Sequence, residues 1–174
     1  NDLLDWLSIN SIRSTELVNK YLTTNEFQIS LFDAYRSAVQ YFNSPVDLSI
    51  GSRFMRMSGE FRLQEGAVPR DFLLEVVRKD DLPLLFRNKC EKINELFKGK
   101  HIERYFSEPP TLIFMAENKE DAQEAAEIFH RMCSYDRFYL TTDAGIVDGM
   151  NDESFLRYLP VSQEIISIKV RDVL

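Results

Sequence analysis

Apolar and polar residues along the chain follow two spacings, one typical of helices and one typical of strands. Helical spacing is clearest over 118–132, where Asn118 can cap the first turn and His130 and Arg131 lie in the last. The same spacing predicts further helices at 10–22, 33–42 and 81–98. Alternating or continuous apolar runs predict strands at 27–33, 53–63, 71–78, 109–117, 137–143, 155–160 and 164–170, the last two as a hairpin.

The order of these elements predicts an α/β fold with a mixed central sheet. The segment between the strands at 53–63 and 71–78 is too short for a crossover, so these two strands should pair antiparallel. From 71–78 onward, strands and helices alternate, which predicts parallel right-handed crossovers and helices on both faces of the sheet. A length of 174 residues suits one hydrophobic core, and we expect a single domain over residues 1–174.

Composition narrows the classes of function. The net charge of −7 argues against a protein that wraps nucleic acid over most of its surface, although a local basic patch is compatible with it. No apolar run reaches the length of a membrane helix, and no glycine-rich nucleotide-binding motif occurs. Cys90 and Cys133 are two lone cysteines among apolar neighbours, which favours reduced, buried thiols in a cytoplasmic protein.

The predicted strand at 71–78 carries one carboxylate, Glu75, inside an otherwise apolar run. A buried carboxylate is costly unless it is paired with a cation or binds a metal ion. One interpretation is a structural ion pair, for which the nearby partners in the sequence are Arg56, Arg78 and Lys89. The other interpretation is a metal ligand in a catalytic site.

Three segments resemble the replication-relaxation family of plasmid and mobile-element proteins, within the restriction-endonuclease-like superfamily. They are RMSGEFRL (56–63), RDFLLEVVRKDD (70–81) and FRNKCEKINELF (86–97). The resemblance covers about residues 10–143 and implies a core ordered helix-strand-strand-strand-helix-strand. In nucleases of that superfamily, acids on neighbouring strands hold Mg²⁺ and a lysine helps to activate water.

The chain departs from the family at the positions that carry the chemistry. Met57-Ser58 replaces the family's Pro-Asp, and Val77 occupies the position of its second strand acid and of the superfamily's strand lysine. We therefore expect no catalytic residue, no metal and no cofactor. The alternative is a Mg²⁺-dependent nuclease with Glu75 as ligand, Glu60 or Glu16 as second ligand and Lys89 as activator.

The resemblance implies a role in plasmid replication, mobilisation or its transcriptional control. It also implies a winged-helix domain upstream that carries most of the DNA binding, and a protein partner or homodimer for this domain. Within this chain the DNA-binding candidates are Arg56, Arg78 and Lys79, for which a salt-bridged hairpin is the alternative. Another alternative is a regulatory domain that senses a small ligand or peptide near Glu75. The segment 143–149 is expected to be a loop.

Overall fold

A seven-stranded mixed sheet forms the centre of this computed structural model, in the order β1-β4-β5-β6-β7-β8-β9. The structure describes the backbone of residues 2–174 and the side chains of residue 15 and residues 17–174. The central strands β5, β6 and β7 are parallel, and the other pairs are antiparallel. The strands are β1 (Val39–Asn43), β4 (Gly59–Leu63), β5 (Arg70–Val76), β6 (Thr111–Ala116), β7 (Phe138–Thr142), β8 (Phe155–Leu159) and β9 (Glu164–Ile168).

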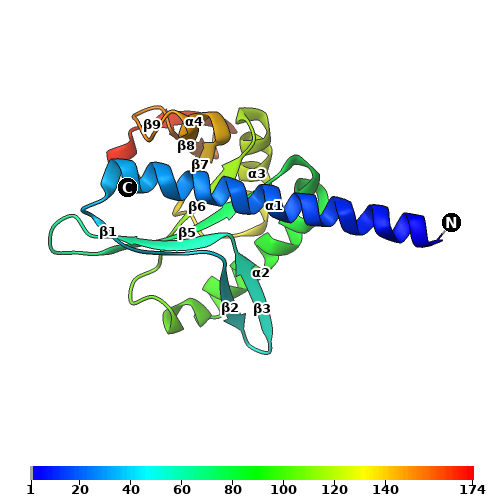
Figure 1. Ribbon diagram of the computed structural model, residues 1–174. Coiled ribbons are helices and arrows are strands. Elements are labelled where there is room, and N and C mark those ends of the chain that lie inside the picture. Colours follow the sequence, from blue (N-terminus) through cyan, green and yellow to red (C-terminus); the bar gives the residue numbers. More distant parts are fainter. Residues whose placement is uncertain (1) are drawn as a thin grey trace.

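Helices cover both faces of the sheet, as the element order predicts. On one face lie α2 (Arg87–Lys98) and α3 (Lys119–Met132), together with a separate hairpin of β2 (Val46–Ile50) and β3 (Arg53–Met57). On the other face lie α1 (Asp2–Tyr35) and the short α4 (Asp143–Val147) (Figure 1). Short helical turns occur at Lys79–Asp81, Leu82–Phe86, His101–Arg104 and Val170–Asp172. The chain is therefore an α/β protein.

The core beneath α1 is built around stacked phenylalanines. Phe61 of β4 lies 4.7 Å from Phe72 of β5 between ring centroids, and the two rings are nearly parallel. Phe27 of α1 packs onto Phe61 at 5.7 Å, and Phe42 of β1 stacks on its other side at 5.8 Å. Phe61 therefore joins the long helix to three strands of the sheet.

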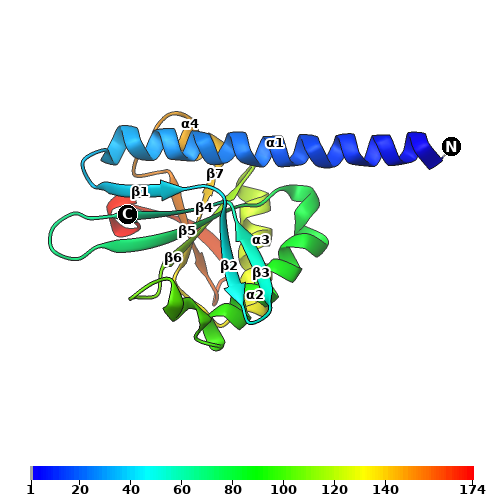
Figure 2. The ribbon, with the colours of Figure 1, turned by 60° about the horizontal axis from the view of Figure 1, so that its bottom comes forward.

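The strand predicted at 27–33 is wrong, because these residues belong to α1. Phe27, Ile29 and Leu31 alternate in the sequence, but only Phe27 and Leu31 are buried, while Ile29 is 61% exposed. A spacing of four residues on one helix face thus imitates a strand pattern. The predicted helix at 10–22 is the middle of the same helix, which Figure 2 shows extending well beyond the sheet at its N-terminal end.

Other predicted elements need smaller corrections. The helix at 33–42 is wrong: α1 ends at Tyr35, and the edge strand β1 follows. The strand at 53–63 is two strands, β3 and β4, interrupted at Ser58, and β2 was not predicted. The expected loop at 143–149 begins with α4. The predicted strands at β6 and β7, the terminal hairpin and α3 are confirmed, and Asn118 caps α3 by accepting from the Asp121 N–H at 2.9 Å.

Both cysteines are buried and unpaired, as predicted from their neighbours. Burial raises the pKa of Cys90 to about 12, so this thiol stays protonated at neutral pH. Among the residues that the structure describes, none of the helices combines the length and the apolar character that a membrane span requires.

We expect Phe61→Ala to lower the free energy of unfolding by about 3–5 kcal/mol, because it removes the ring shared by α1, β1 and β5 and leaves a cavity. Urea unfolding followed by circular dichroism measures this loss. Phe54→Ala is the matched control: Phe54 is 69% exposed on the hairpin, and its removal should change stability by less than about 0.5 kcal/mol. Equal losses in the two variants would contradict this description of the core.

Candidate functional site

Ser58 marks the point at which the chain leaves the hairpin and enters the central sheet. It lies between β3 and β4, one residue before the Gly59–Leu74 pair that ends the ladder of β4 and β5. There the Ser58 hydroxyl accepts a hydrogen bond from the Val76 N–H at 2.9 Å. A side chain thus provides the backbone pairing that β4 no longer supplies to the end of β5.

Glu75 faces the same junction and is surrounded by donors. Its Oε2 atom accepts from the Ser58 N–H at 3.1 Å and from the Ser58 hydroxyl at 3.3 Å. Its Oε1 atom accepts from the Nζ atom of Lys89 on α2, which forms an ion pair with it. The Glu75 side chain is only 4% exposed. The carboxylate is therefore compensated by a cation and hydrogen-bonded at both oxygens.

The packing of α2 places the Lys89 ammonium. The next residue, Cys90, is fully buried, as is Ile93 one turn further along, so these side chains fix the buried face of the helix against the sheet. Lys89 emerges beside that face and is 24% exposed at its side chain. From there its ammonium reaches the buried carboxylate of Glu75.

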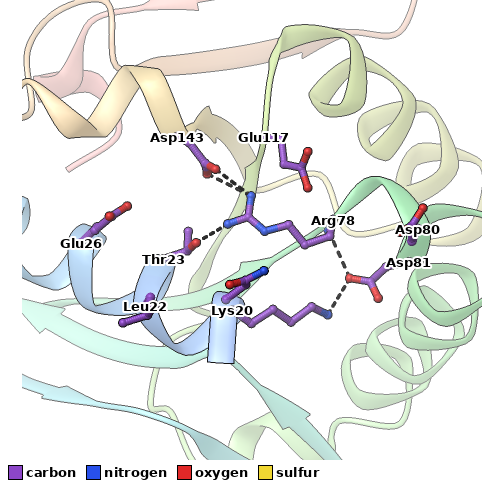
Figure 3. A pocket seen from close by; sticks show the side chains of 10 residues that line it. Lys20, Leu22, Thr23, Glu26, Arg78, Asp80, Asp81, Glu117 and Asp143 are labelled. Carbon is purple, nitrogen blue, oxygen red and sulfur yellow. Dashed lines mark hydrogen bonds and ion pairs between the residues drawn. The ribbon is translucent and has the colours of Figure 1, made fainter. Parts of the chain in front are cut away.

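A second group of charged side chains lines a cavity of about 500 Å³ at the carboxyl ends of β5, β6 and β7 (Figure 3). This edge of a parallel sheet is where open α/β proteins commonly bind ligands. The lining comes from α1, from the ends of β5 and β6, and from the start of α4. Its residues are Asn19, Lys20, Leu22, Thr23, Glu26, Arg78, Asp80, Asp81, Glu117 and Asp143.

Both cationic side chains of this cavity, Arg78 and Lys20, form ion pairs with acids (Figure 3). Arg78 donates to both carboxylate oxygens of Asp143, at 2.9 and 3.1 Å, and to the hydroxyl of Thr23 on α1. Lys20 of α1 pairs with Asp81 at 2.6 Å, and Asp81 also accepts from the Arg78 backbone N–H at 3.1 Å. These bonds hold α1 against the end of the sheet.

Burial raises the pKa of Asp143, and the Arg78 guanidinium opposes that shift. The nearby carboxylate of Glu26 raises the pKa further. Desolvation is the largest of these causes, as expected for an acid at the wall of a half-enclosed cavity.

The Glu75–Lys89 junction and the charged residues of the larger cavity lie next to each other. A void of about 30 Å³, lined in part by Lys20, Glu75, Asp81 and Lys89, lies between them. A further cavity of about 280 Å³ opens beside Glu75, between α1 and the hairpin. Lys20 lines all three spaces, so it stands at the boundary between the Glu75 junction and the larger cavity.

The structure brings together some of the predicted residues and separates others. Glu75 and Lys89 form the ion pair that one interpretation of the sequence proposes. Glu60 instead accepts from the side-chain amide of Asn43 at 2.8 Å. The side chain of Glu16 lies outside the described residues. Among the described residues, no group of three or more His, Cys, Asp and Glu side chains has the arrangement of a metal site.

The predicted DNA-binding residues have three different environments. Arg56 is exposed on β3 and pairs with Asp47 of β2 through two bonds of 2.8 Å. Arg78 is enclosed, with a side chain only 13% exposed, and its guanidinium is paired with the carboxylate of Asp143. Lys79 is exposed in the turn that follows β5.

Sequence reasoning missed the contribution of α1 to both sites. Lys20, Thr23 and Phe27 share one side of the helix, and this spacing of three and four residues was the available signal. Asp81 was also missed. The available signal was the run Arg78-Lys79-Asp80-Asp81, two basic residues and two acids directly after a buried strand. The prediction of a strand at 27–33 concealed the helix that carries these residues.

Comparison with known proteins gives no relative: no family model, no curated protein and no solved structure matches this chain.

We expect Lys89→Met to lower the free energy of unfolding by about 3–5 kcal/mol, because it leaves the buried Glu75 carboxylate without its cation. Chemical denaturation measures the loss. In the double variant Lys89→Met with Glu75→Gln, the uncompensated charge is removed while an oxygen remains to accept from Ser58, so most of the stability should return.

Lys92→Met, one turn further along α2, is the matched control and should change stability by less than about 0.5 kcal/mol. A Lys89→Met variant as stable as Lys92→Met would show that the ion pair does not stabilise the fold. A double variant as unstable as Lys89→Met alone would show that charge compensation is not the cause.

Proposed function

We propose that this chain is a non-catalytic domain of restriction-endonuclease-like architecture from a plasmid or mobile-element protein. It would act in replication, mobilisation or their transcriptional control through binding to DNA or to another protein. The proposal of a non-catalytic role rests on the bonding of Glu75. One of its carboxylate oxygens accepts hydrogen bonds from Ser58, and the other accepts from Lys89.

The order of elements in the sheet supports the architecture. A helix, α1, precedes three successive antiparallel strands, β1, β4 and β5; α2 then crosses to β6, which is parallel to β5. This is the order that the sequence resemblance implies, with the β2–β3 hairpin inserted after the first strand. In addition, Ser58, which directly precedes β4, contacts Glu75 of the neighbouring strand β5, and these two residues are the counterparts of two family acids.

The chemistry of the junction favours a structural role over metal binding. Mg²⁺ binds through several oxygen ligands and loses its water reluctantly, so it needs more than one carboxylate near it. Ser58 contributes a donor to Glu75 where the family has an acid, and Asp81, which shares the small void, is already paired with Lys20. A metal ion would have to displace Lys89 from Glu75 to reach it.

The charges on the surface favour binding through the hairpin. Arg56 is 68% exposed at its side chain, so a phosphate could compete with Asp47 for its guanidinium. Arg78 contributes less to such binding because Asp143 and Thr23 occupy it. In this proposal, an upstream winged-helix domain supplies most of the DNA affinity, and the present domain binds a protein partner or a second copy of itself.

Calorimetric titration with Mg²⁺ and with Mn²⁺ tests the non-catalytic role. We expect no heat of binding up to millimolar metal for the wild-type chain or for Glu75→Gln, because Lys89 already compensates the carboxylate. Glu60→Gln is the control for an acid on the neighbouring strand.

Tight binding that Glu75→Gln abolishes and Glu60→Gln retains would overturn the proposal. Cleavage of supercoiled plasmid DNA in Mg²⁺, lost in Glu75→Gln, would overturn it directly and would support the nuclease alternative. Circular dichroism of each variant shows that any loss reflects the site and not unfolding.

A further inference from the structure

The cavity of about 280 Å³ beside Glu75 is lined in part by apolar side chains. Leu17 and Tyr21 of α1 lie one helical turn apart on its wall, and both are more than half exposed. Pro45, just before the hairpin, supplies further apolar surface, and the fully buried Met57 of β3 also lines the cavity. Exposed apolar side chains that line a concave space, instead of lying scattered over the surface, are typical of a ligand site.

The same cavity also has a cationic lining. Lys20, Arg56 and Lys89 line it, and Glu75 is the one carboxylate among its lining residues. An ammonium group carries three N–H donors. Within the described part of the chain, the Lys20 ammonium contacts Asp81 and the Lys89 ammonium contacts Glu75, one carboxylate each. Each ammonium therefore retains donors for a further acceptor.

Both lysine side chains are partly shielded from bulk solvent. They are 26% and 24% exposed, for Lys20 and Lys89 respectively. Partly desolvated donors form stronger bonds to an anionic acceptor than fully exposed ones, because the effective dielectric constant is lower. The larger cavity has the opposite character, since five acids line it against two cations.

We propose that the cavity beside Glu75 binds a small molecule that joins a carboxylate or phosphate group to an apolar ring or chain. The anionic group accepts from the ammonium groups of Lys20 and Lys89, and Arg56 approaches it from the rim. The apolar body packs on the exposed side chains of Tyr21 and Leu17. A volume of about 280 Å³ lies just below the usual range for pockets that hold drug-sized ligands, which suits a single ring with its side chain.

Such a ligand would occupy the cavity whether or not the domain binds DNA, so this inference goes beyond the proposed function. It would also contact α1, the hairpin and α2 together, through Tyr21, Arg56 and Lys89.

Two-dimensional ¹H–¹⁵N NMR titration of the full chain tests the site. The probes are 3-phenylpropionate and phenyl phosphate, with neutral 3-phenylpropanol and inorganic phosphate as matched partners. We expect saturable shifts of amide signals around Tyr21, Met57 and Lys89 with at least one of the two amphipathic anions. The neutral alcohol and the inorganic ion should bind at least about tenfold more weakly, since each lacks half of the recognition. Comparison of the two anions distinguishes a carboxylate site from a phosphate site.

Two surface variants test the apolar and the cationic lining of the cavity separately. Tyr21→Ala should weaken binding of the preferred anion about three- to tenfold, and Arg56→Gln about two- to fivefold. Their controls lie on the same elements but outside this cavity: Leu22→Ala on α1 and Arg53→Gln on β3 should leave the affinity unchanged.

Three results of the titrations would overturn the proposal. They are an absence of saturable shifts at millimolar concentrations of both anions, equal binding of the anions and the neutral alcohol, and shifts confined to the larger cavity around Glu117 and Asp143. Equal effects of Tyr21→Ala and Leu22→Ala would likewise contradict it.

Discussion

The charge of Glu75 is the constraint on which the centre of this structure depends. A carboxylate in the buried part of a sheet needs a cation and hydrogen-bond donors, because it has lost its hydration. Lys89 comes from α2 on one face of the sheet, and Ser58 comes from the point where the hairpin joins β4. One carboxylate thus fixes the position of a helix, the end of β5 and the direction in which the chain leaves the hairpin.

The long helix α1 depends on a related set of contacts. Phe27 anchors it over the stacked rings of the sheet, while Lys20 and Thr23 attach it to Asp81 and Arg78 at the carboxyl ends of the parallel strands. The helix thereby separates two cavities of opposite character, an acidic one above the strand ends and a cationic, partly apolar one beside Glu75. Lys20 lines both, so its ion pair with Asp81 lies at the boundary between them.

The α/β class, the crossovers and the strands β5, β6 and β7 could be predicted from the sequence because their apolar runs are long and because Asn118 marks the start of α3 clearly. The N-terminal third could not, since Phe27, Ile29 and Leu31 alternate as in a strand although they lie on a helix. The ion pair of Glu75 with Lys89 was foreseeable from local order, whereas the pairing of Arg78 with Asp143 joins residues 65 positions apart and needs the tertiary fold. Ser58 was expected only as a missing acid, and its role in ending the strand ladder follows from the sheet geometry.

The most direct test of the role of Glu75 is a crystal structure of the wild-type chain soaked in millimolar Mn²⁺, with anomalous diffraction data to locate the metal. We expect no anomalous peak within coordination distance of the Glu75 oxygens, and a Lys89 ammonium that still contacts Oε1. A manganese ion bound to Glu75, with Lys89 displaced and a second carboxylate turned toward the metal, would contradict it and would identify the junction as a metal centre.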